Sequence, residues 1–431
     1  MLYNNNMPKL FRPDMPRGVE GRRWTVGALV SSRCTRVSAA LVEAGGSGRN
    51  LLVEVVQAAA AEVPRQTVAL FNDLSGSGPG KISAGMIAAC RAQLADVQAA
   101  LVNKLAATMA LSSNRILALG VHDPGLWDTV HGESAGYLGL CDAARLAEST
   151  GMNVVDAFPA RDLALGGRGG PVTAVAEWML LRSQLRNRVL LDLGRTTRLT
   201  YLPAASADRA DAKVVSFEVG PGTAILDMLV QRLTDGQQHF DPGGRFAVQG
   251  HRIEELIGHW MRDPYFDVPP PRWHPRGVRP ERFLGDALQM AVSSDWSVRD
   301  LLCTATCFIA EMIADTLARR LPKDAEFDEI IVTGGGQQNG MLLREIGRLV
   351  KAPLIRDADL HMPVGALEPA CIGVLALLYM DQIPASHTAI SKTETPRLLG
   401  RLTPGSPQTW LKMLETCAAN SPAMRPLRSA M

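Results

Sequence analysis

Two apolar segments that end in glycine and polar residues constrain the fold of this chain more than any other feature. The first segment, residues 189–202, joins two apolar runs through a polar turn that contains Asp192, Gly194, Thr196 and Thr197. Small residues in such a turn let backbone amides and hydroxyls approach a phosphate. The segment therefore predicts a strand–turn–strand hairpin that binds phosphate.

The second segment, residues 328–339, is a short apolar run that ends in Gly334, Gly335 and Gly336. A glycine turn of this kind lets the backbone lie close to an adenosine. Two such elements in one chain predict a nucleotide cleft between two α/β lobes. The alternative reading of the first segment is an ordinary polar hairpin turn.

Length and composition narrow the function classes. At 431 residues, with 46% apolar residues, the chain is long for a single core, and two lobes are expected. A net charge of +2 gives no field that would attract nucleic acid or a membrane surface. Seven cysteines without a Cys-x-x-Cys pair predict reduced thiols, and the eight histidines show no zinc spacing.

We expect no targeting signal in the first residues of the chain. Residues 1–23 are polar and contain three prolines, which predicts a disordered extension without the apolar core of a signal peptide. No run reaches the ~18 apolar residues of a membrane span. A cytoplasmic protein is expected, and a homodimer is compatible with the sequence.

Alternating strand and helix patterns predict an α/β fold. Hairpins near 24–43 and 189–202 start similar units, as expected of a duplicated lobe with mixed sheets. The expected lobes are 24–187 and 188–382, with a peripheral tail at 383–431. Residues 66–80 read as turns, and 235–283 as irregular, proline-rich chain with a short helix at 251–261.

Four segments, in order along the chain, resemble the motifs of one family. Residues 161–171 read Arg-Asp-Leu-Ala-Leu-Gly-Gly-Arg-Gly-Gly-Pro, and residues 217–222 read Phe-Glu-Val-Gly-Pro-Gly. Residues 263–271 read Asp-Pro-Tyr-Phe-Asp-Val-Pro-Pro-Pro, and residues 333–339 read Thr-Gly-Gly-Gly-Gln-Gln-Asn. The chain resembles the 1,6-anhydro-N-acetylmuramic acid kinases, cytosolic sugar kinases of the actin/hexokinase/Hsp70-like superfamily.

The resemblance implies two RNase H-like lobes of mixed sheet flanked by helices, the actin-like ATPase fold, with a cleft between the lobes. It implies ATP and Mg²⁺ as cofactors, an amino sugar as substrate and a role in cell-wall recycling. Glu218 takes the place of the catalytic base, and Asp192 that of a carboxylate that holds Mg²⁺ through water. The implied nucleotide-binding residues are Asp192, Gly194, Thr196, Thr197, Gly220, Gly222, Gly334, Gly335, Gly336 and Asn339.

The implied sugar-binding residues are His122, Arg161, Asp162, Gly166, Gly167 and Glu368. For each, an ordinary structural role is the alternative: a buried histidine, an Arg161–Asp162 ion pair, or a surface glutamate at Glu368. Gly220 and Gly222 could equally form a tight turn into a helix, with Thr223 as its N-cap.

The chain departs from the family at its first phosphate hairpin. There the family's glycine is Ser31, and its two aspartates are Thr35 and Ser38. The catalytic aspartate becomes Glu218, and segment 272–282 is altered. Two alternatives follow: a degenerate member that binds a sugar or nucleotide without turnover, as a sensor or partner protein, and a kinase that acts on another sugar.

Overall fold

The computed structural model describes residues 22–46, 51–76, 82–128, 136–207, 210–274, 277–322, 325–360, 362–363, 365–393 and 395–420. The chain forms two compact units. Unit 1 comprises residues 1–180, 361–387 and 393–431, and unit 2 comprises residues 181–360 and 388–392. Residues 1–21 of the predicted extension lie outside the described residues.

Unit 1 is built on a six-stranded mixed sheet in the order β13-β7-β4-β1-β2-β3. Its strands are β1 (Arg23–Val30), β2 (Arg36–Gly45), β3 (Leu52–Glu62), β4 (Ile116–His122), β7 (Val154–Asp156) and β13 (Arg401–Thr403), with a separate hairpin of β5 (Leu126–Asp128) and β6 (Gly136–Leu138). Its helices are α1 (Arg65–Gly76), α2 (Ala84–Thr108), α3 (Ala143–Thr150), α4 (Phe158–Leu163), α5 (Ala174–Leu181), α11 (Leu367–Met380) and α13 (Pro407–Asn420).

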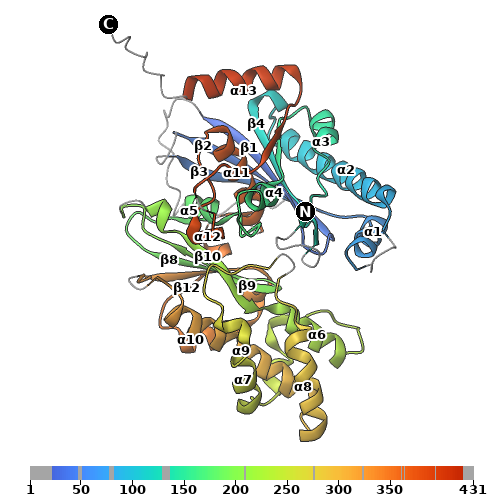
Figure 1. Cartoon of the computed structure of the whole chain (residues 1–431), viewed down its shortest axis with the longest axis vertical. Coiled ribbons are helices and arrows are strands. Elements are labelled where there is room, and N and C mark those ends of the chain that lie inside the picture. Colours follow the sequence, from blue (N-terminus) through green and yellow to red (C-terminus); the bar gives the residue numbers. More distant parts are fainter. Residues whose placement is uncertain are drawn as a thin grey trace. The chain divides into compact units, whose positions relative to one another are not determined.

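Successive side chains of β1 point to opposite faces of this sheet, and helices cover both faces. Val26, Ala28 and Val30 belong to the core shared with α2, beside which α3 lies (Figure 1). Gly27, between them, faces α11, where an added Cβ would lie 1.8 Å from the Pro369 carbonyl oxygen. Gly120 of β4 meets the same helix at Ile372. Glycines in two adjacent strands therefore let α11 pack directly on the sheet.

Unit 2 has a five-stranded mixed sheet in the order β10-β9-β8-β11-β12. Its strands are β8 (Arg188–Leu193), β9 (Thr196–Leu202), β10 (Val215–Pro221), β11 (Glu329–Thr333) and β12 (Leu354–Arg356). Its helices are α6 (Thr223–Leu233), α7 (Glu254–Met261), α8 (Glu281–Ser294), α9 (Val298–Arg319), α10 (Gly340–Leu349) and α12 (Thr388–Ser391).

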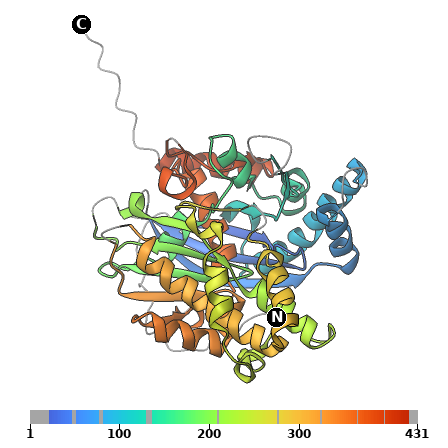
Figure 2. The ribbon, with the colours of Figure 1, turned by 60° about the horizontal axis from the view of Figure 1, so that its bottom comes forward.

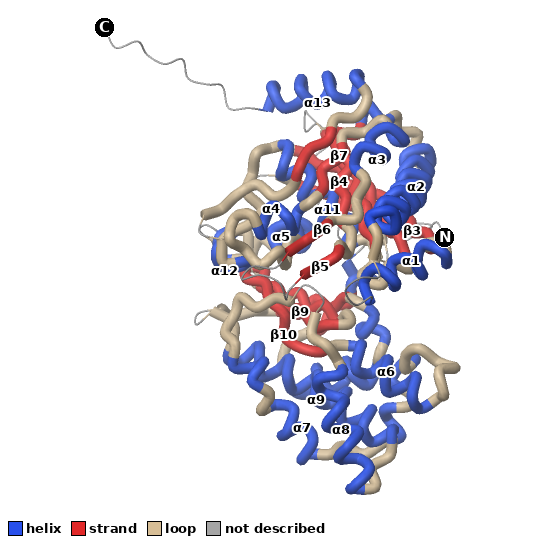
Figure 3. The backbone as a smooth tube through the Cα atoms, turned by 45° about the vertical axis from the view of Figure 1, so that its right-hand side comes forward, coloured by secondary structure: helices blue, strands red, loops and turns tan. Residues whose placement is uncertain are grey.

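Helix α9 is the centre of the helical layer of unit 2. It packs against α6, α7 and α10, and these helices gather on one side of the sheet (Figures 2 and 3). Ser297 and Asp300 form a reciprocal capping box at its start. Its length and apolar composition would suffice to cross a membrane, but 78% of its most apolar window is buried inside the structure. That burial is typical of a core helix.

The two sheets repeat one strand order. In each, three antiparallel strands are followed by two strands parallel to the first, as β1-β2-β3 with β4 and β7, and as β8-β9-β10 with β11 and β12. The predicted α/β class with two mixed-sheet lobes is confirmed by this order. The cleft between the lobes stays a prediction.

The division of the chain differs from the predicted one. Residues 361–382, expected in the second lobe, belong to unit 1 because α11 packs on β1 and β4. The tail is not peripheral, since β13 pairs antiparallel with β7 and Arg401 forms an ion pair of 2.7 Å with Asp156. Arg23, expected in the extension, opens β1 and is buried beside Asp381.

Two local predictions were also wrong. Residues 66–76, part of the stretch expected as turns, belong to α1, whose Phe71 and Leu74 are buried. Helix α8 begins at Glu281, inside the stretch expected to be irregular, and buries Phe283 and Leu284. In both cases apolar residues of the helix face a core. The polar and proline residues around them hide the helical pattern in the sequence.

Candidate active site

The β8–β9 hairpin turn of unit 2 is held by the turn that joins β10 to α6. The amides of Gly222 and Thr223 donate to the carbonyl oxygens of Arg195 (2.9 Å) and Gly194 (2.8 Å). An added Cβ at Gly222 would lie 2.2 Å from the Gly194 oxygen. Glycine at 222 is therefore required for the two turns to touch.

These contacts correct the reading of Gly220 and Gly222 as nucleotide-binding residues. The first amides of α6 are used by the hairpin, and so they do not face an anion. Thr223 is the first helical residue and not the N-cap, which is Gly222. Gly220 faces the core, where an added Cβ would meet the Met312 sulfur at 2.3 Å.

The glycine turn after β11 lies against the same hairpin. An added Cβ at Gly334 would lie 2.6 Å from Asp192 Oδ1, and one at Gly336 would lie 2.7 Å from Leu193 Cβ. Gly334 also has a φ of 77°, which favours glycine. Gly335 alone is exposed, with open space beside its Cα. The two predicted nucleotide turns are therefore neighbours within unit 2, and Gly335 is the glycine that could lie under a ligand.

Two further predicted nucleotide residues have internal roles. Asn339 caps α10, since its side chain accepts a hydrogen bond of 3.1 Å from the Leu342 amide. Thr197 is fully buried, and its hydroxyl donates to the Pro221 carbonyl at 3.2 Å. Their side-chain oxygens form hydrogen bonds within unit 2, which corrects the reading of these two atoms as ligands of a nucleotide.

Asp192 and Thr196 flank the hairpin turn. Asp192 lies 3.5 Å from the Arg198 guanidinium, and both side chains are partly exposed. The Thr196 hydroxyl accepts a hydrogen bond of 3.2 Å from the Val278 amide. This bond ties the hairpin to the segment that leads into α8.

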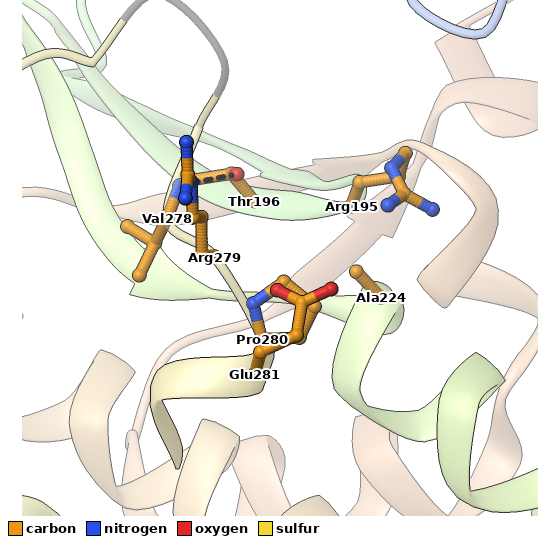
Figure 4. Close-up of a pocket in the computed structure, with 7 residues that line it drawn as sticks. All are labelled: Arg195, Thr196, Ala224, Val278, Arg279, Pro280 and Glu281. Atoms are coloured by element: carbon orange, nitrogen blue, oxygen red, sulfur yellow. Dashed lines mark hydrogen bonds between the residues drawn. The ribbon is translucent and has the colours of Figure 1, made fainter. Parts of the chain in front are cut away.

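A cavity of about 340 Å³ lies between this hairpin, the start of α6 and the start of α8. Its lining residues are Arg195, Thr196, Ala224, Val278, Arg279, Pro280 and Glu281 (Figure 4). Arg195 and Arg279 are exposed cations, and the Glu281 carboxylate extends from α8 toward the hairpin. Two arginines around a hairpin turn suit an anionic group such as a phosphate.

Glu218 is a buried carboxylate on β10, with 4% of its surface exposed. Its Oε2 accepts hydrogen bonds from the His274 amide (3.0 Å) and from His274 Nδ1 (2.8 Å). Burial raises the pKa of Glu218 above its usual value, and the contacts with His274 oppose that rise. A carboxylate whose pKa is raised toward neutrality is suited to accept a proton.

Sequence reasoning missed Arg272 and His274. Arg272 is 1% exposed, and its guanidinium donates to the carbonyl oxygens of Glu218 (2.7 Å) and Val219 (2.9 Å). The Glu218 amide in turn donates to the Arg272 carbonyl oxygen at 2.9 Å. Both residues lie in segment 272–282, where the chain departs from the family motif, and so no motif marked them. The sequence showed only an apolar strand that ends at Glu218 and a proline-rich loop further along the chain.

The first hairpin turn, between β1 and β2 in unit 1, is closed on itself. Ser31 Oγ accepts the amides of Thr35 and Arg36, each at 3.1 Å, and the Ser31 carbonyl oxygen accepts the Cys34 amide at 2.7 Å. Cys34 is fully buried, which turns the loop toward the core. Three amides of this turn are therefore used internally, and the reading of a degenerate phosphate hairpin stays a prediction.

His122 ends β4 in unit 1, and burial lowers its pKa to about 4. Asp123, next to it, accepts the amides of Gly125 and Leu140 through Oδ1 and that of Cys141 through Oδ2. Burial raises the pKa of Asp123 to about 6, against these hydrogen bonds. His122 is thus a neutral imidazole at neutral pH, able to hydrogen-bond a hydroxyl.

The glycine loop at 166–170 is organised around Asp162, which is 1% exposed. Its carboxylate accepts the Gly169 amide (2.8 Å) and the Ser386 hydroxyl (2.9 Å), and Gly167 packs directly over it. The Asp162 carboxylate therefore supports the loop, which corrects its reading as a sugar ligand. Gly169 packs on Trp127, so the loop lies beside the segment that follows His122.

The remaining predicted sugar residues are exposed. Arg161 lies on α4, and Gly166 has open space beside its Cα. Glu368 lies in the first turn of α11, just before Pro369, which packs on β1. These three positions are accessible in unit 1, and their contact with a sugar stays a prediction.

The donor set for a metal is small. Among the residues that the structure describes, no group of three or more His, Cys, Asp and Glu side chains could hold a metal ion. Asp192 offers one carboxylate, which fits a Mg²⁺ ion only where phosphate and water oxygens supply the other ligands.

Comparison with known proteins identifies the family. The family model for anhydro-N-acetylmuramic acid kinase matches residues 33–405. The chain belongs to the anhydro-N-acetylmuramic acid kinase family. Members of this family are sugar kinases, and the chain is accordingly a phosphotransferase with an alcohol group as acceptor.

Relatives that carry the name anhydro-N-acetylmuramic acid kinase match most of the chain. The protein from Acaryochloris marina is 28% identical over 390 residues, which cover 88% of this chain and 98% of the relative. The one from Salinibacter ruber is 29% identical, over 90% of this chain and 97% of the relative. One from a Synechococcus strain is 32% identical, over 61% of this chain and 70% of the relative.

Solved structures show fainter likeness. A ROK family glucokinase from Streptomyces griseus, in complex with glucose and AMPPNP, has a TM-score of 0.37 at 11% identity, over 82% of this chain and 98% of that one. A gluconate kinase from Lactobacillus acidophilus has a TM-score of 0.41 at 9% identity, over 93% and 97%. Both TM-scores lie below 0.5.

Proposed function

We propose that the chain is an ATP-dependent kinase that opens the 1,6-anhydro bridge of anhydro-N-acetylmuramic acid and phosphorylates the oxygen that the opening releases. The family match over residues 33–405 and the names of the relatives support this substrate. The reaction would take place in the cytoplasm, as a step in the recycling of cell-wall peptidoglycan.

One observation carries the proposal. Strand β10 bears the buried carboxylate of Glu218, and the end of the same strand braces the hairpin turn beside the cavity of Arg195 and Arg279. The proposed base and the proposed anion-binding turn would thus be held by one rigid element. Such an element fixes the distance between the two groups, which phosphoryl transfer requires.

In the proposed step, Glu218 takes a proton from a water molecule as the water oxygen bonds to C1 of the sugar. The bond from C1 to the bridging oxygen O6 breaks, and O6 forms a bond to the γ-phosphorus of ATP. The bond from that phosphorus to the bridging oxygen of ADP breaks, so the products are ADP, a 6-phosphosugar and one proton.

The remaining residues would bind and orient. Arg195 and Arg279 would contact phosphate oxygens, and Gly335 would lie under the adenosine. Asp192 would hold Mg²⁺ together with the phosphates, and the ion would neutralise phosphate charge. In unit 1, His122, Arg161, Gly166 and Glu368 are proposed to contact the sugar.

The test is a direct assay. Purified protein is incubated with ATP, Mg²⁺ and 1,6-anhydro-N-acetylmuramic acid, ADP is measured continuously, and the sugar product is identified by mass spectrometry. We expect ADP and the 6-phosphosugar in equal amounts, with no ADP when the sugar is omitted. Glu218→Gln should lower kcat by about a hundredfold or more. ADP formation on glucose or N-acetylglucosamine alone would point to a kinase for another sugar.

A second candidate function has one observation in its favour. The first hairpin uses three of its own amides internally, and phosphate donors are thereby lost. A family member that binds nucleotide or sugar without turnover would show this. Such a binder would be stabilised against heat by ligand while releasing no ADP, and Glu218→Gln would leave the binding unchanged.

A further inference from the structure

The carboxylate of Glu218 is held asymmetrically. Among the described residues, both hydrogen bonds that it accepts fall on Oε2, one from the His274 amide at 3.0 Å and one from His274 Nδ1 at 2.8 Å. A carboxylate only accepts, so this geometry places a proton on Nδ1 of the imidazole. One oxygen is thus anchored, and Oε1 is left as the oxygen that can receive a proton.

The position of His274 is itself fixed. Two residues earlier, the guanidinium of Arg272 bonds the carbonyl oxygens of Glu218 and Val219, while the Arg272 carbonyl oxygen receives the Glu218 amide. The guanidinium also lies 4.8 Å from the centre of the Tyr265 ring. These bonds attach the backbone two residues before His274 to the part of β10 that carries Glu218.

A glutamate in this role needs such an anchor. Its side chain has one more rotatable bond than an aspartate, and a misplacement of about 1 Å in a reacting group can lower a rate by roughly a hundredfold. The imidazole is half-exposed, with 49% of the side chain accessible, whereas the Glu218 side chain is 5% accessible. A half-exposed histidine bonded to a buried carboxylate contributes more to orientation than to packing.

We propose that His274 is a positioning residue for Glu218, which holds Oε2 through Nδ1–H and so presents Oε1 to the attacking water. This inference rests on the proposed function of Glu218 as the base. His274 does not touch the sugar or the nucleotide in this scheme. It neither gains nor loses a proton, and the proton from water goes to Oε1.

The groups that face Glu218 define the expected pH dependence. They are His274 and Arg272 from the loop, Tyr265 from the short helix Pro264–Asp267, and Arg198, which is paired with Glu218 across β9 and β10. Burial raises the pKa of Glu218, and the bond from His274 counteracts that effect. Loss of the imidazole should therefore raise the pKa of the base further and move the acid limb of the kcat/KM profile to higher pH.

The test compares three variants of the full chain with the unchanged protein. In His274→Leu, kcat should fall about ten- to hundredfold while the KM for ATP stays the same, and the acid limb should shift upward. His274→Asn, whose side-chain amide can donate from nearly the position of Nδ1, should recover most of the activity and the original pH profile. His239→Leu, at an exposed histidine of the same unit, should change neither.

The outcomes separate the two claims. If the unchanged protein releases no ADP with any sugar, the proposed function fails, and a role of His274 in it fails too, before any variant is made. If the unchanged protein turns over and His274→Leu keeps its kcat and pH profile, the positioning role alone is overturned. Equal losses in the Asn and Leu variants would likewise overturn it, because a lost hydrogen bond would then not explain the effect.

Discussion

Two hairpins occupy equivalent places in the two units, and different contacts hold their turns. In unit 1, the turn between β1 and β2 is closed by Ser31, which accepts two amides through its hydroxyl and a third through its carbonyl oxygen. In unit 2, the turn between β8 and β9 is held from outside, by Gly222, Thr223, Gly334 and Gly336. One strand order therefore supports either an inward-facing turn or a turn braced beside a cavity.

The comparison shows which glycines are needed to brace a hairpin turn. Glycines in unit 2 brace the hairpin because neighbouring backbone lies within the volume of a Cβ. A serine in the corresponding turn of unit 1 replaces external bracing with an internal hydrogen-bond network. Phosphate binding is therefore expected to depend on the second hairpin far more than on the first.

The largest expected effect comes from removing the brace. In Gly222→Ala, the new methyl group would meet the Gly194 carbonyl oxygen at 2.2 Å, and rigid backbone surrounds it on both sides. We expect a loss of about 2–3 kcal/mol in the free energy of unfolding, measured by urea titration. Gly335→Ala, where the space is open, is the matched control and should change stability by less than about 0.5 kcal/mol. Equal effects at both positions would remove the distinction between bracing and accessible glycines.

A smaller effect should separate the arginines of the two hairpins. Arg195→Ala removes a cation from the cavity wall and should raise the KM for ATP about three- to tenfold. The loss of a fully buried charge-assisted hydrogen bond would raise the KM more, but Arg195 is exposed. Arg36→Ala removes an exposed arginine from the closed hairpin and should leave that KM nearly unchanged. A larger rise in Arg36→Ala would show that the first hairpin carries the phosphates after all.

A third change makes the first hairpin resemble the second. Ser31→Gly removes the hydroxyl that accepts the Thr35 and Arg36 amides, and about 1 kcal/mol of stability should be lost. The released amides could then face an anion, so ATP binding measured by calorimetry should tighten about two- to fivefold. Weaker binding in this variant would mean that the serine network itself shapes the nucleotide site.

The two units should also differ in the sign of their pH response. Burial raises the pKa of Asp123 in unit 1 to about 6, so the folded state holds its proton more tightly than the unfolded state, and stability from this group falls as pH rises from about 4 to 6. In unit 2, burial raises the pKa of Asp300, but hydrogen bonds from Ser297 and His251 outweigh it and lower it to about 2. Its contribution is present above about pH 4 and is lost as pH falls toward 2.

Urea midpoints measured across this range should show both contributions. Asp123→Asn should flatten the decrease between about pH 4 and 6, and Asp300→Asn should flatten the loss at lower pH. Identical pH profiles in the unchanged protein and both variants would contradict the assigned shifts.

The sequence predicted the elements whose patterns are local. The hairpin at 189–202 and the strand before Gly334 were placed correctly, because apolar runs that end in glycine indicate a buried strand and a turn. Strand β13 could not be predicted, since residues 401–403 carry no pattern and become a strand only by pairing with β7. The same holds for the place of α11, which depends on glycines in strands far from it along the chain.

The roles of Gly335 and Glu218 stay predictions, since the glycine is exposed and the carboxylate is buried, and neither observation tests a contact with a ligand. Several other predicted side chains have partners within the protein. The side chains of Asp162, Thr197 and Asn339 have the right chemistry, but internal hydrogen bonds occupy them. A sequence shows which atoms can bond, and only the fold shows which partners reach them first.

The order of strands along the chain bears on how the protein is made. On the ribosome, every strand of unit 2 emerges before α11 and β13, which unit 1 needs to cover one face and complete one edge of its sheet. Unit 2 can therefore fold while one face of the sheet of unit 1 is still uncovered and exposes apolar side chains. A chaperone that binds apolar surfaces would be of most use during that interval.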